Sequence, residues 1–193
     1  MLPVTPVVLE GKHVRLEPME ERHAADLAEA FEMEFFRYFP TIRPAAETPE
    51  AMAQFIREVN LLPNCLPFAI ISLPEDKAVG MSTYMDIRQH HNGLEVGMTW
   101  LAKSHQGTMV NPEAKLLLLG HAFENLGCER VQLKTDARNL QSQRAIEKMG
   151  AKKEGVLRSH LIMPDGLMRD SVMYSVIKTE WPQVKTGLEK RLA

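Results

Sequence analysis

A polar loop that leads directly into a helix is the feature of the sequence best suited to bind a ligand. Residues 102–111 contain Gln106, Gly107 and Thr108, and they separate an apolar, strand-like stretch from a helix that we expect to begin at Pro112. The first turn of a helix carries unpaired backbone N–H groups and the positive end of the helix dipole, so it attracts phosphate without a basic side chain. Many strand-to-helix turns bind nothing, so the loop by itself favours a phosphate or pyrophosphate site without establishing one.

Further along the chain, polar residues mark the start of a second helix and a glycine marks its end. Asn139 follows a strand-like stretch, Ser142 lies three residues later, and Gly150 follows the last residue of the helical pattern. With these motifs the sequence resembles the GNAT superfamily of N-acetyltransferases, in the branch typified by the RimJ/RimL ribosomal-protein acetyltransferases. The motifs that carry the resemblance extend over nearly the whole chain: Val14-Arg15-Leu16, Glu95-Val96-Gly97, Gln106-Gly107-Thr108, Asn111-Pro112-Glu113-Ala114-Lys115, Thr135-Asp136-Ala137-Arg138-Asn139 with Ser142, and Lys148-Met149-Gly150-Ala151.

The resemblance implies an enzyme that takes acetyl-coenzyme A as its donor and transfers the acetyl group directly to a primary amine. It implies that the pyrophosphate of the donor lies on the loop from Gln106 to Asn111, and that the pantetheine arm runs beside the strand that ends at Trp100 and Leu101. Asn139 matches a family position that orients this arm. The expected cofactor-binding residues are therefore Trp100, Leu101, Gln106, Gly107, Thr108, Met109, Val110, Asn111, Asn139 and Ser142.

Such a transfer has three chemical requirements, and the resemblance assigns residues to each. It needs a deprotonated amine, hydrogen-bond donors for the oxygen that gains charge, and a proton for the departing thiolate. Glu95 matches a family position that often serves as the base, commonly through water, and Ser142 matches the position of the proton donor. Backbone N–H groups near Thr99 and Trp100 are expected to stabilise the charged oxygen. We therefore take Glu95 and Ser142 as the candidate catalytic residues.

Each of these residues also has a purely structural interpretation. A carboxylate at Glu95 that is partly buried beside the apolar residues Val96 and Met98 would have its pKa raised toward the working pH, as a general base requires. A Glu95 that faces solvent on an alternating strand would have no catalytic role. Asn139 and Ser142 are equally residues that start helices, so they have a capping interpretation beside the functional one.

The sequence departs from the superfamily pattern at two places. Met109 and Asn111 stand where many members have glycine or alanine, which bears on how closely a phosphate can approach the backbone. On the later helix, Ile146 stands where many relatives have a tyrosine acid, so Ser142 or a water molecule must protonate the thiolate. These departures leave a second hypothesis open, namely a noncatalytic coenzyme A-binding or scaffold protein of the same fold.

The order of elements that must position these residues is typical of an α/β fold. Alternating apolar residues predict strands, and spacings of three or four residues predict helices, among them one that Thr48 caps and Pro49 begins. A mixed, mostly antiparallel seven-stranded sheet flanked by helices follows from this order. The expected strands are 13–18, 68–73, 79–88, 94–101, 131–135, 156–162 and 168–177; the expected helices are 20–31, 48–60, 112–126, 140–149 and a last helix capped by Thr179 that runs to Leu192.

The sequence indicates the acceptor amine less clearly than it indicates the donor. From Glu10 to Glu58 the sequence has eleven acidic and six basic residues, and in this fold the early helices would wall the acceptor site. Such an excess attracts a cationic amine, although a solvated helix face explains the same residues. A protein N-terminus, which the RimJ/RimL branch suggests, and a small amine both remain open as acceptors.

Composition limits the remaining classes of function. The chain of 193 residues is 45% hydrophobic and 25% charged, which predicts a single globular domain over residues 1–193. A net charge of −2 gives no basic surface for nucleic acid or for a membrane. Cys65 and Cys128 suit neither a disulfide framework nor a zinc site, and His90 and His91 precede a turn, so we expect no metal. With no signal peptide in the sequence, we expect a cytoplasmic enzyme, either a monomer or a homodimer.

Overall fold

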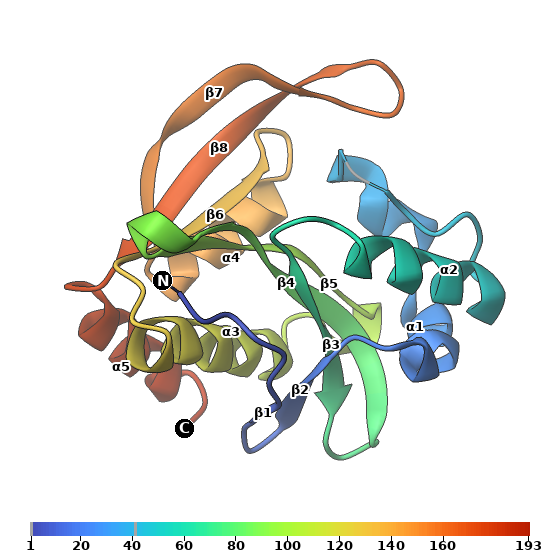
Figure 1. Ribbon diagram of the computed structural model, residues 1–193, viewed down its shortest axis with the longest axis horizontal. Helices are drawn as coiled ribbons and strands as arrows, with labels where there is room; N and C mark the ends of the chain where they lie inside the picture. Colours follow the sequence, from blue (N-terminus) through green and yellow to red (C-terminus); the bar gives the residue numbers. More distant parts are fainter. Residues whose placement is uncertain (1, 41) are drawn as a thin grey trace.

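One twisted β-sheet runs through the protein, and all the helices lie on its two faces (Figure 1). The computed structural model describes residues 2–40 and 42–193. Neighbouring strands are antiparallel except β5 and β6, which are parallel, as expected for a mixed, mostly antiparallel sheet. The strands lie in the order β1 (Leu9–Glu10), β2 (Val14–Pro18), β3 (Leu66–Ser72), β4 (Lys77–Arg88), β5 (Gly93–Leu101), β6 (Arg130–Asp136), β8 (Met168–Ile177) and β7 (Lys152–Ile162).

The sheet has eight strands, one more than the seven that the pattern predicts. The additional strand is β1, whose two residues pair with Leu16 and Arg15 of β2. A strand this short contains no alternation that could be recognised in the sequence. It extends the edge of the sheet next to β2 and leaves the other predicted strands in place.

The described residues form five α-helices and several short helical turns; α5 follows the last strand, and the others lie between strands. None of the helices among the described residues is long and apolar enough to cross a membrane. The α-helices are α1 (Ala24–Ala30), α2 (Pro49–Asn60), α3 (Val110–Gly120), α4 (Leu140–Met149) and α5 (Trp181–Lys190), and the short turns are η1 (Glu21–His23), η2 (Met33–Tyr38), η3 (Gln89–His91), η4 (Lys103–His105) and the π-helical turn η5 (His121–Asn125).

The ends of the helices test the predicted caps. Thr48 is the N-cap of α2, with its hydroxyl accepting a hydrogen bond from the N–H of Ala51 at 3.3 Å. The predicted cap at Thr179 is wrong, because α5 begins at Trp181 with Glu180 as its N-cap. Pro182 lies in the first turn of α5, where its fixed φ suits the start of a helix, and this moves the start beyond Thr179.

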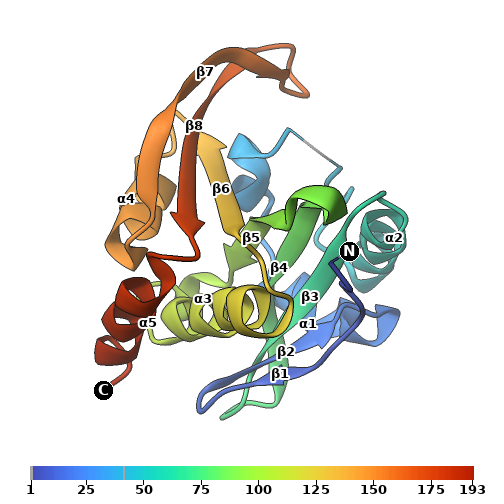
Figure 2. The same cartoon turned by 60° about the vertical axis from the view of Figure 1, so that its left-hand side comes forward.

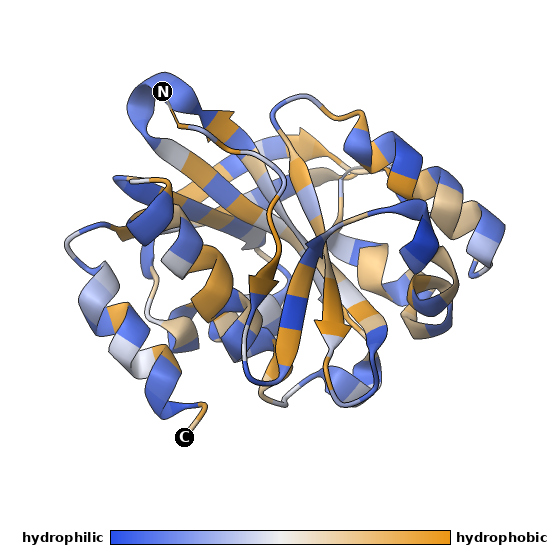
Figure 3. Ribbon diagram, turned by 60° about the horizontal axis from the view of Figure 1, so that its bottom comes forward, coloured by the Kyte–Doolittle hydropathy of each residue, from blue (hydrophilic) through white to orange (hydrophobic). Residues whose placement is uncertain are grey.

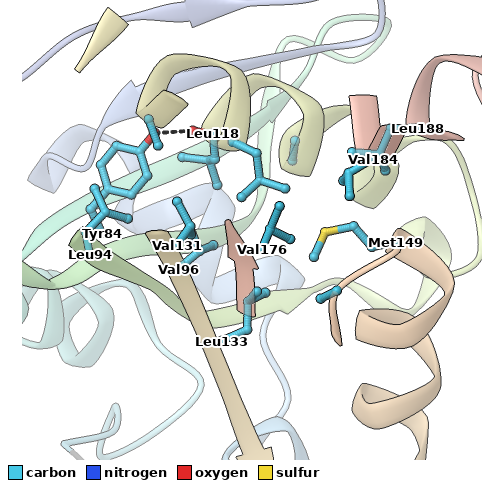
Figure 4. Close-up of a cluster of buried hydrophobic side chains, with 14 of the residues drawn as sticks. Tyr84, Leu94, Val96, Leu118, Val131, Leu133, Met149, Val176, Val184 and Leu188 are labelled. Carbon is cyan, nitrogen blue, oxygen red and sulfur yellow. Dashed lines mark hydrogen bonds between the residues drawn. The ribbon is translucent and has the colours of Figure 1, made fainter. Parts of the chain in front are cut away.

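The two faces of the sheet carry separate apolar cores. We call the side covered by α3 and α5 the α3 face, and the side covered by α1, η2 and α2 the α1 face. Figure 4 shows the core of the α3 face, where the hydroxyl of Tyr84 donates to the carbonyl of Leu118. The hydropathy colours of Figure 3 alternate along parts of the sheet, as expected where one face of a strand enters an apolar core and the other face carries polar side chains. The sequence of β2 has this pattern, with Val14 and Leu16 in the core of the α3 face and Arg15 between them.

A buried carboxylate fixes α3 against the edge of the sheet. The side chain of Glu113 accepts hydrogen bonds from the backbone N–H groups of Lys12, His13 and Val14, with distances of 2.8, 2.7 and 2.9 Å. Gly11 has to be small here, since a Cβ at that position would lie 2.7 Å from Cδ of Glu113. The turn between β1 and β2 thereby holds the first turns of α3 in place.

Candidate active site

The parallel strands β5 and β6 stay together over only part of their length. Residues Gly93, Leu94 and Glu95 pair with Arg130, Val131 and Gln132, and no pairing follows although both strands continue. In Figure 2, β6 continues beside β8 while β5 stays beside β4. From Val96 to Leu101, β5 is therefore paired with β4 along one edge, while its edge toward β6 pairs with no strand of the described chain. We call the region between the unpaired ends of the two strands the β5–β6 opening.

A β-bulge changes the direction of side chains in this unpaired part of β5. Thr83 of β4 lies opposite Gly97, and Met81 lies opposite Trp100, so two residues of β5 face the single residue Ser82. The first of the two, Met98, has a φ of 47°. Left-handed backbone is uncommon for a residue with a Cβ, and bulges of this kind often lie next to active sites.

Glu95 lies at the point where the strands separate, and its side chain is buried. Its Oε2 accepts hydrogen bonds from Nε2 of Gln132 at 3.0 Å and from Nζ of Lys134 at 2.7 Å. The residue is 1% exposed, so the solvent-facing interpretation is wrong. Of the two apolar neighbours expected for Glu95, Val96 enters the core of the α3 face and Met98 the core of the α1 face. Strand alternation thus turns the carboxylate away from Val96 and toward the cation of Lys134 on β6, a partner that the sequence analysis did not include.

The polar loop after β5 is held in shape by its own side chains. Gln106 donates from Nε2 to the carbonyl of Leu101 at 3.0 Å, and its Oε1 accepts from Nε2 of Gln141 at 3.2 Å. These two bonds connect the end of β5 to the first turn of α4. The exposed Gly107 has a φ of 75°, with open space where a Cβ would be. The loop thus presents backbone beside the start of α3.

The helix that follows this loop starts earlier than predicted. The hydroxyl of Thr108 donates to the carbonyl of His105 at 2.8 Å and accepts from the N–H of Val110 at 3.3 Å. This pair of bonds closes the turn two residues before the expected start at Pro112. Asn111 therefore lies within the first turn of α3, and Met109 is the N-cap.

Asn139 and Ser142 meet at the start of α4. Asn139 is the N-cap of this helix, and its Oδ1 accepts a hydrogen bond from the N–H of Ser142 at 3.0 Å. Ser142 is half-buried. Ile146, one turn further along, packs partly buried against the core of the α3 face. Gly150 ends the helix with a φ of 104°.

Comparison with known proteins identifies the family. Residues 13–152 match the model of the acetyltransferase (GNAT) domain. The chain belongs to the GNAT acetyltransferases. It is 27% identical to the uncharacterised N-acetyltransferase p20 of Bacillus licheniformis over 145 residues, which are 74% of this chain and 80% of p20.

Solved structures agree with this family. The chain superposes with a TM-score of 0.90 and 42% identity on a protein of T. thermophilus provisionally named an acetyltransferase, covering 98% of this chain and 99% of that one. It shares its fold, at 20% identity and a TM-score of 0.81, with Mycobacterium smegmatis RimJ, which was solved in complex with CoA-disulfide; 96% of this chain and 94% of that one are covered. This GNAT acetyltransferase is therefore an acyltransferase that uses acetyl-coenzyme A to acetylate an amine.

The structure of the acetyltransferase also contains charged residues that the sequence did not single out. Lys134 forms an ion pair with Glu95, and Arg169 of β8 is only 5% exposed. Nη1 of Arg169 donates to the carbonyl of Tyr38 at 2.9 Å, which joins η2 to the far part of the sheet, and burial lowers the pKa of this arginine. Alternation along β6 and β8 is the signal that would have grouped Lys134 and Arg169 with Glu95 on the α1 face.

The residues considered for metal or thiol chemistry lie away from this arrangement. His90 and His91 lie in the exposed turn η3, at the end of β4. Cys128 is fully buried, and burial raises the pKa of its thiol to about 11. Because the thiolate is the reactive form of cysteine, this thiol is unreactive at neutral pH.

Proposed function

We propose that this acetyltransferase transfers the acetyl group of acetyl-coenzyme A directly to a primary amine within the β5–β6 opening. The observation that carries the proposal is the separation of β5 from β6 immediately after Glu95 and Gln132. It leaves backbone N–H and C=O groups of β5 unpaired, next to a loop that ends in a helix N-terminus. Unpaired backbone of this kind binds an extended amide chain, and the helix start binds phosphate.

The residues present fit acetyl-coenzyme A through their backbone more than through their side chains. The ring of Trp100 packs among aromatic residues of the α1 face, stacked with Phe35 at 5.8 Å between ring centroids, so Trp100 and Leu101 offer their backbone to the pantetheine arm. The loop from Gln106 to Asn111, including Thr108, Met109 and Val110, would hold the pyrophosphate. Asn139 would keep its place beside the arm by capping α4.

We assign the proton transfers to Glu95 and Ser142. Oε2 of Glu95 already accepts two hydrogen bonds, which leaves Oε1 to take a proton from the amine through a water molecule. Gly97 leaves room beside that oxygen, since a Cβ there would lie 3.0 Å from it. Backbone N–H groups near Thr99 and Trp100 would stabilise the charged oxygen, and the hydroxyl of Ser142 would protonate the departing thiolate.

The acceptor is proposed as a primary amine of one of two kinds. The resemblance to the RimJ/RimL branch supports a protein N-terminus, and the acidic excess of the early segments supports a small cationic amine. We further propose that residues 1–193 form one catalytic domain and that the enzyme acts in the cytoplasm. Both cysteines are unpaired, which suits a reducing compartment.

An acceptor screen tests the proposed function. The purified protein is incubated with acetyl-coenzyme A and separate pools of N-terminal peptides, amino acids and polyamines, and the release of free thiol is measured. We expect thiol release that depends on one pool and a matching gain of one acetyl group in the acceptor. Binding of acetyl-coenzyme A in calorimetry without thiol release in any pool would instead support a noncatalytic coenzyme A-binding protein.

Two glycines, one before α3 and one after η5, provide a matched test of the cofactor loop. Gly107 and Gly127 have φ values of 75° and 73°, and both have open space at the position of a Cβ. Gly107→Val and Gly127→Val should therefore lose similar stability, about 1–2 kcal/mol each from the left-handed backbone. Only Gly107→Val should also weaken acetyl-coenzyme A binding, because its side chain crowds the backbone that faces the pyrophosphate. Calorimetric titration and thermal shift measure the difference, and equal affinities for the two variants would remove the loop from the cofactor site.

Glu95→Gln tests the proposed base. At neutral pH we expect kcat to fall about 100-fold or more, because a general base contributes about 100- to 10,000-fold. The loss should shrink as the pH rises toward the pKa of the acceptor amine, which then arrives deprotonated, and KM for acetyl-coenzyme A should stay within about threefold. The exposed variant Glu189→Gln serves as the control. If the Glu95→Gln enzyme has the wild-type pH–rate profile, Glu95 is not the base and its role is structural.

Ser142→Ala tests the proton donor. The backbone N–H of Ser142, not its hydroxyl, bonds to Asn139, so the cap of α4 should survive the substitution. A hydroxyl that acts only as the thiolate leaves contributes to kcat and not to ground-state binding. We expect kcat to fall at least tenfold while KM for acetyl-coenzyme A is little changed. A pure loss of affinity would make Ser142 a binding residue, and wild-type kinetics would assign the proton to water.

A further inference from the structure

A lysine lies buried beneath β5, and no described residue provides it with an acidic partner. Lys115 of α3 is 8% exposed, and its Nζ donates to Oγ1 of Thr99 at 2.7 Å and to Oγ of Ser82 at 3.3 Å. The two hydroxyls also share a hydrogen bond of 2.7 Å. No carboxylate of the described chain lies within ion-pair distance of Nζ. The lysine therefore depends on two neutral hydroxyls for its polar contacts.

The charged groups closest along the chain face away from Lys115. Glu113 of α3 is occupied by three N–H groups at the edge of the sheet, and Glu95 of β5 points to the α1 face. On β4, Tyr84 donates to the carbonyl of Leu118, and burial raises the pKa of this phenol well above its ordinary value, so it stays neutral. Burial alone lowers the pKa of Lys115 to about 7.

The position of this lysine coincides with the bulge of β5. Thr99 is the second of the two residues that face Ser82, and it belongs to the part of β5 that borders the β5–β6 opening. Lys115 thus holds together, from the α3 face, the hydroxyls on both sides of the bulge. The backbone N–H groups assigned above to the charged oxygen belong to these same residues of β5.

We propose that Lys115 is a positioning residue for acetyl transfer: its ammonium group fixes the Thr99–Ser82 hydroxyl pair and places positive charge behind the backbone N–H groups of the β5 bulge. The inference rests on the proposed function, because it assumes that the charged oxygen forms beside β5. Preorganised charge in a water-excluded site stabilises a developing oxyanion more than the same charge in water. An apolar side chain of similar length would pack in this position but would supply neither the bonds nor the charge.

A buried ammonium without a counter-ion also has a consequence for stability, and its sign can be worked out. The pKa in the folded protein, about 7, is below the ordinary value of 10.5 in the unfolded chain. The unfolded state therefore binds the proton more tightly between these values, and this lysine's contribution to stability rises with pH from about 7 to about 10.5. Below pH 7 the lysine destabilises the fold by its full amount. Lys115→Met should then have a melting temperature equal to or above that of the wild type at pH 6.

The test compares Lys115→Met with the wild type in thiol release and in thermal unfolding. We expect kcat to fall about tenfold or more at pH 6, with KM for acetyl-coenzyme A within about threefold, because the effect is confined to the transition state. The ratio of wild-type to variant kcat should decrease as the pH rises through about 7, where Lys115 loses its charge. The exposed variant Lys190→Met should show neither effect.

If the Lys115→Met variant unfolds, Thr99→Val removes the same Lys115–Thr99 hydrogen bond from its other side. It keeps Lys115 but removes the hydroxyl between the ammonium and the bulge, so it should lower kcat at pH 6 in the same way, and the double variant should add little. A ratio of rates that does not change with pH, together with a lower melting temperature, would assign Lys115 to folding alone and overturn the proposal. A wild-type protein that releases no thiol with any acceptor would overturn the proposed function and this inference together.

Discussion

The separation of β5 from β6 is the constraint on which the rest of the structure depends. Three residue pairs hold the two strands together, and from Val96 onward the inner edge of β5 pairs with no strand of the described chain. Unpaired backbone groups away from water are unfavourable, and exposed strand edges tend to recruit another extended chain. In the function proposed above, the amide groups of the acetyl-coenzyme A arm would pair with this edge. The opening thus combines an unsatisfied strand edge, a helix start and a buried carboxylate at the point of separation.

Helix α3 carries two buried charged residues whose hydrogen-bond partners differ in kind. The carboxylate of Glu113 is satisfied by three backbone N–H groups and ties the helix to the edge of the sheet. The ammonium of Lys115, on the same helix, finds among the described residues no hydrogen-bond acceptors other than the hydroxyls of Ser82 on β4 and Thr99 on β5. A satisfied buried charge is compatible with a purely structural role, whereas an unneutralised one lowers stability and persists where it serves a function. This contrast within one helix distinguishes Glu113, which anchors α3, from Lys115, to which we assign a positioning role at the site.

Much of the fold follows from local patterns, and much of the site does not. The predicted strand 168–177 coincides with β8, and Thr48 caps α2 as expected, because alternation and capping depend on neighbours in the sequence. The partners of Glu95 depend instead on the register between strands: Gln132 and Lys134 are 37 and 39 positions away. Likewise, the start of α3 is set by the hydroxyl of Thr108, a local bond whose geometry the sequence does not specify. Strands and caps that depend on neighbouring residues were therefore predictable, while the partners of Glu95 and the start of α3 were not.

The bulge explains how one strand serves both faces of the sheet. Strict alternation along β5 would place Glu95, Gly97 and Thr99 on the same face. The additional residue opposite Ser82 breaks the alternation, so that Met98 and Trp100 both enter the core of the α1 face while Thr99 turns toward Lys115 on the other. In the mechanism proposed above, Glu95 would then meet the acceptor from one side while the backbone near Thr99 is supported from the other. The left-handed backbone at Met98 is unfavourable in itself, and in this proposal it is the feature that lets acid–base chemistry and oxyanion stabilisation act from opposite faces of the sheet.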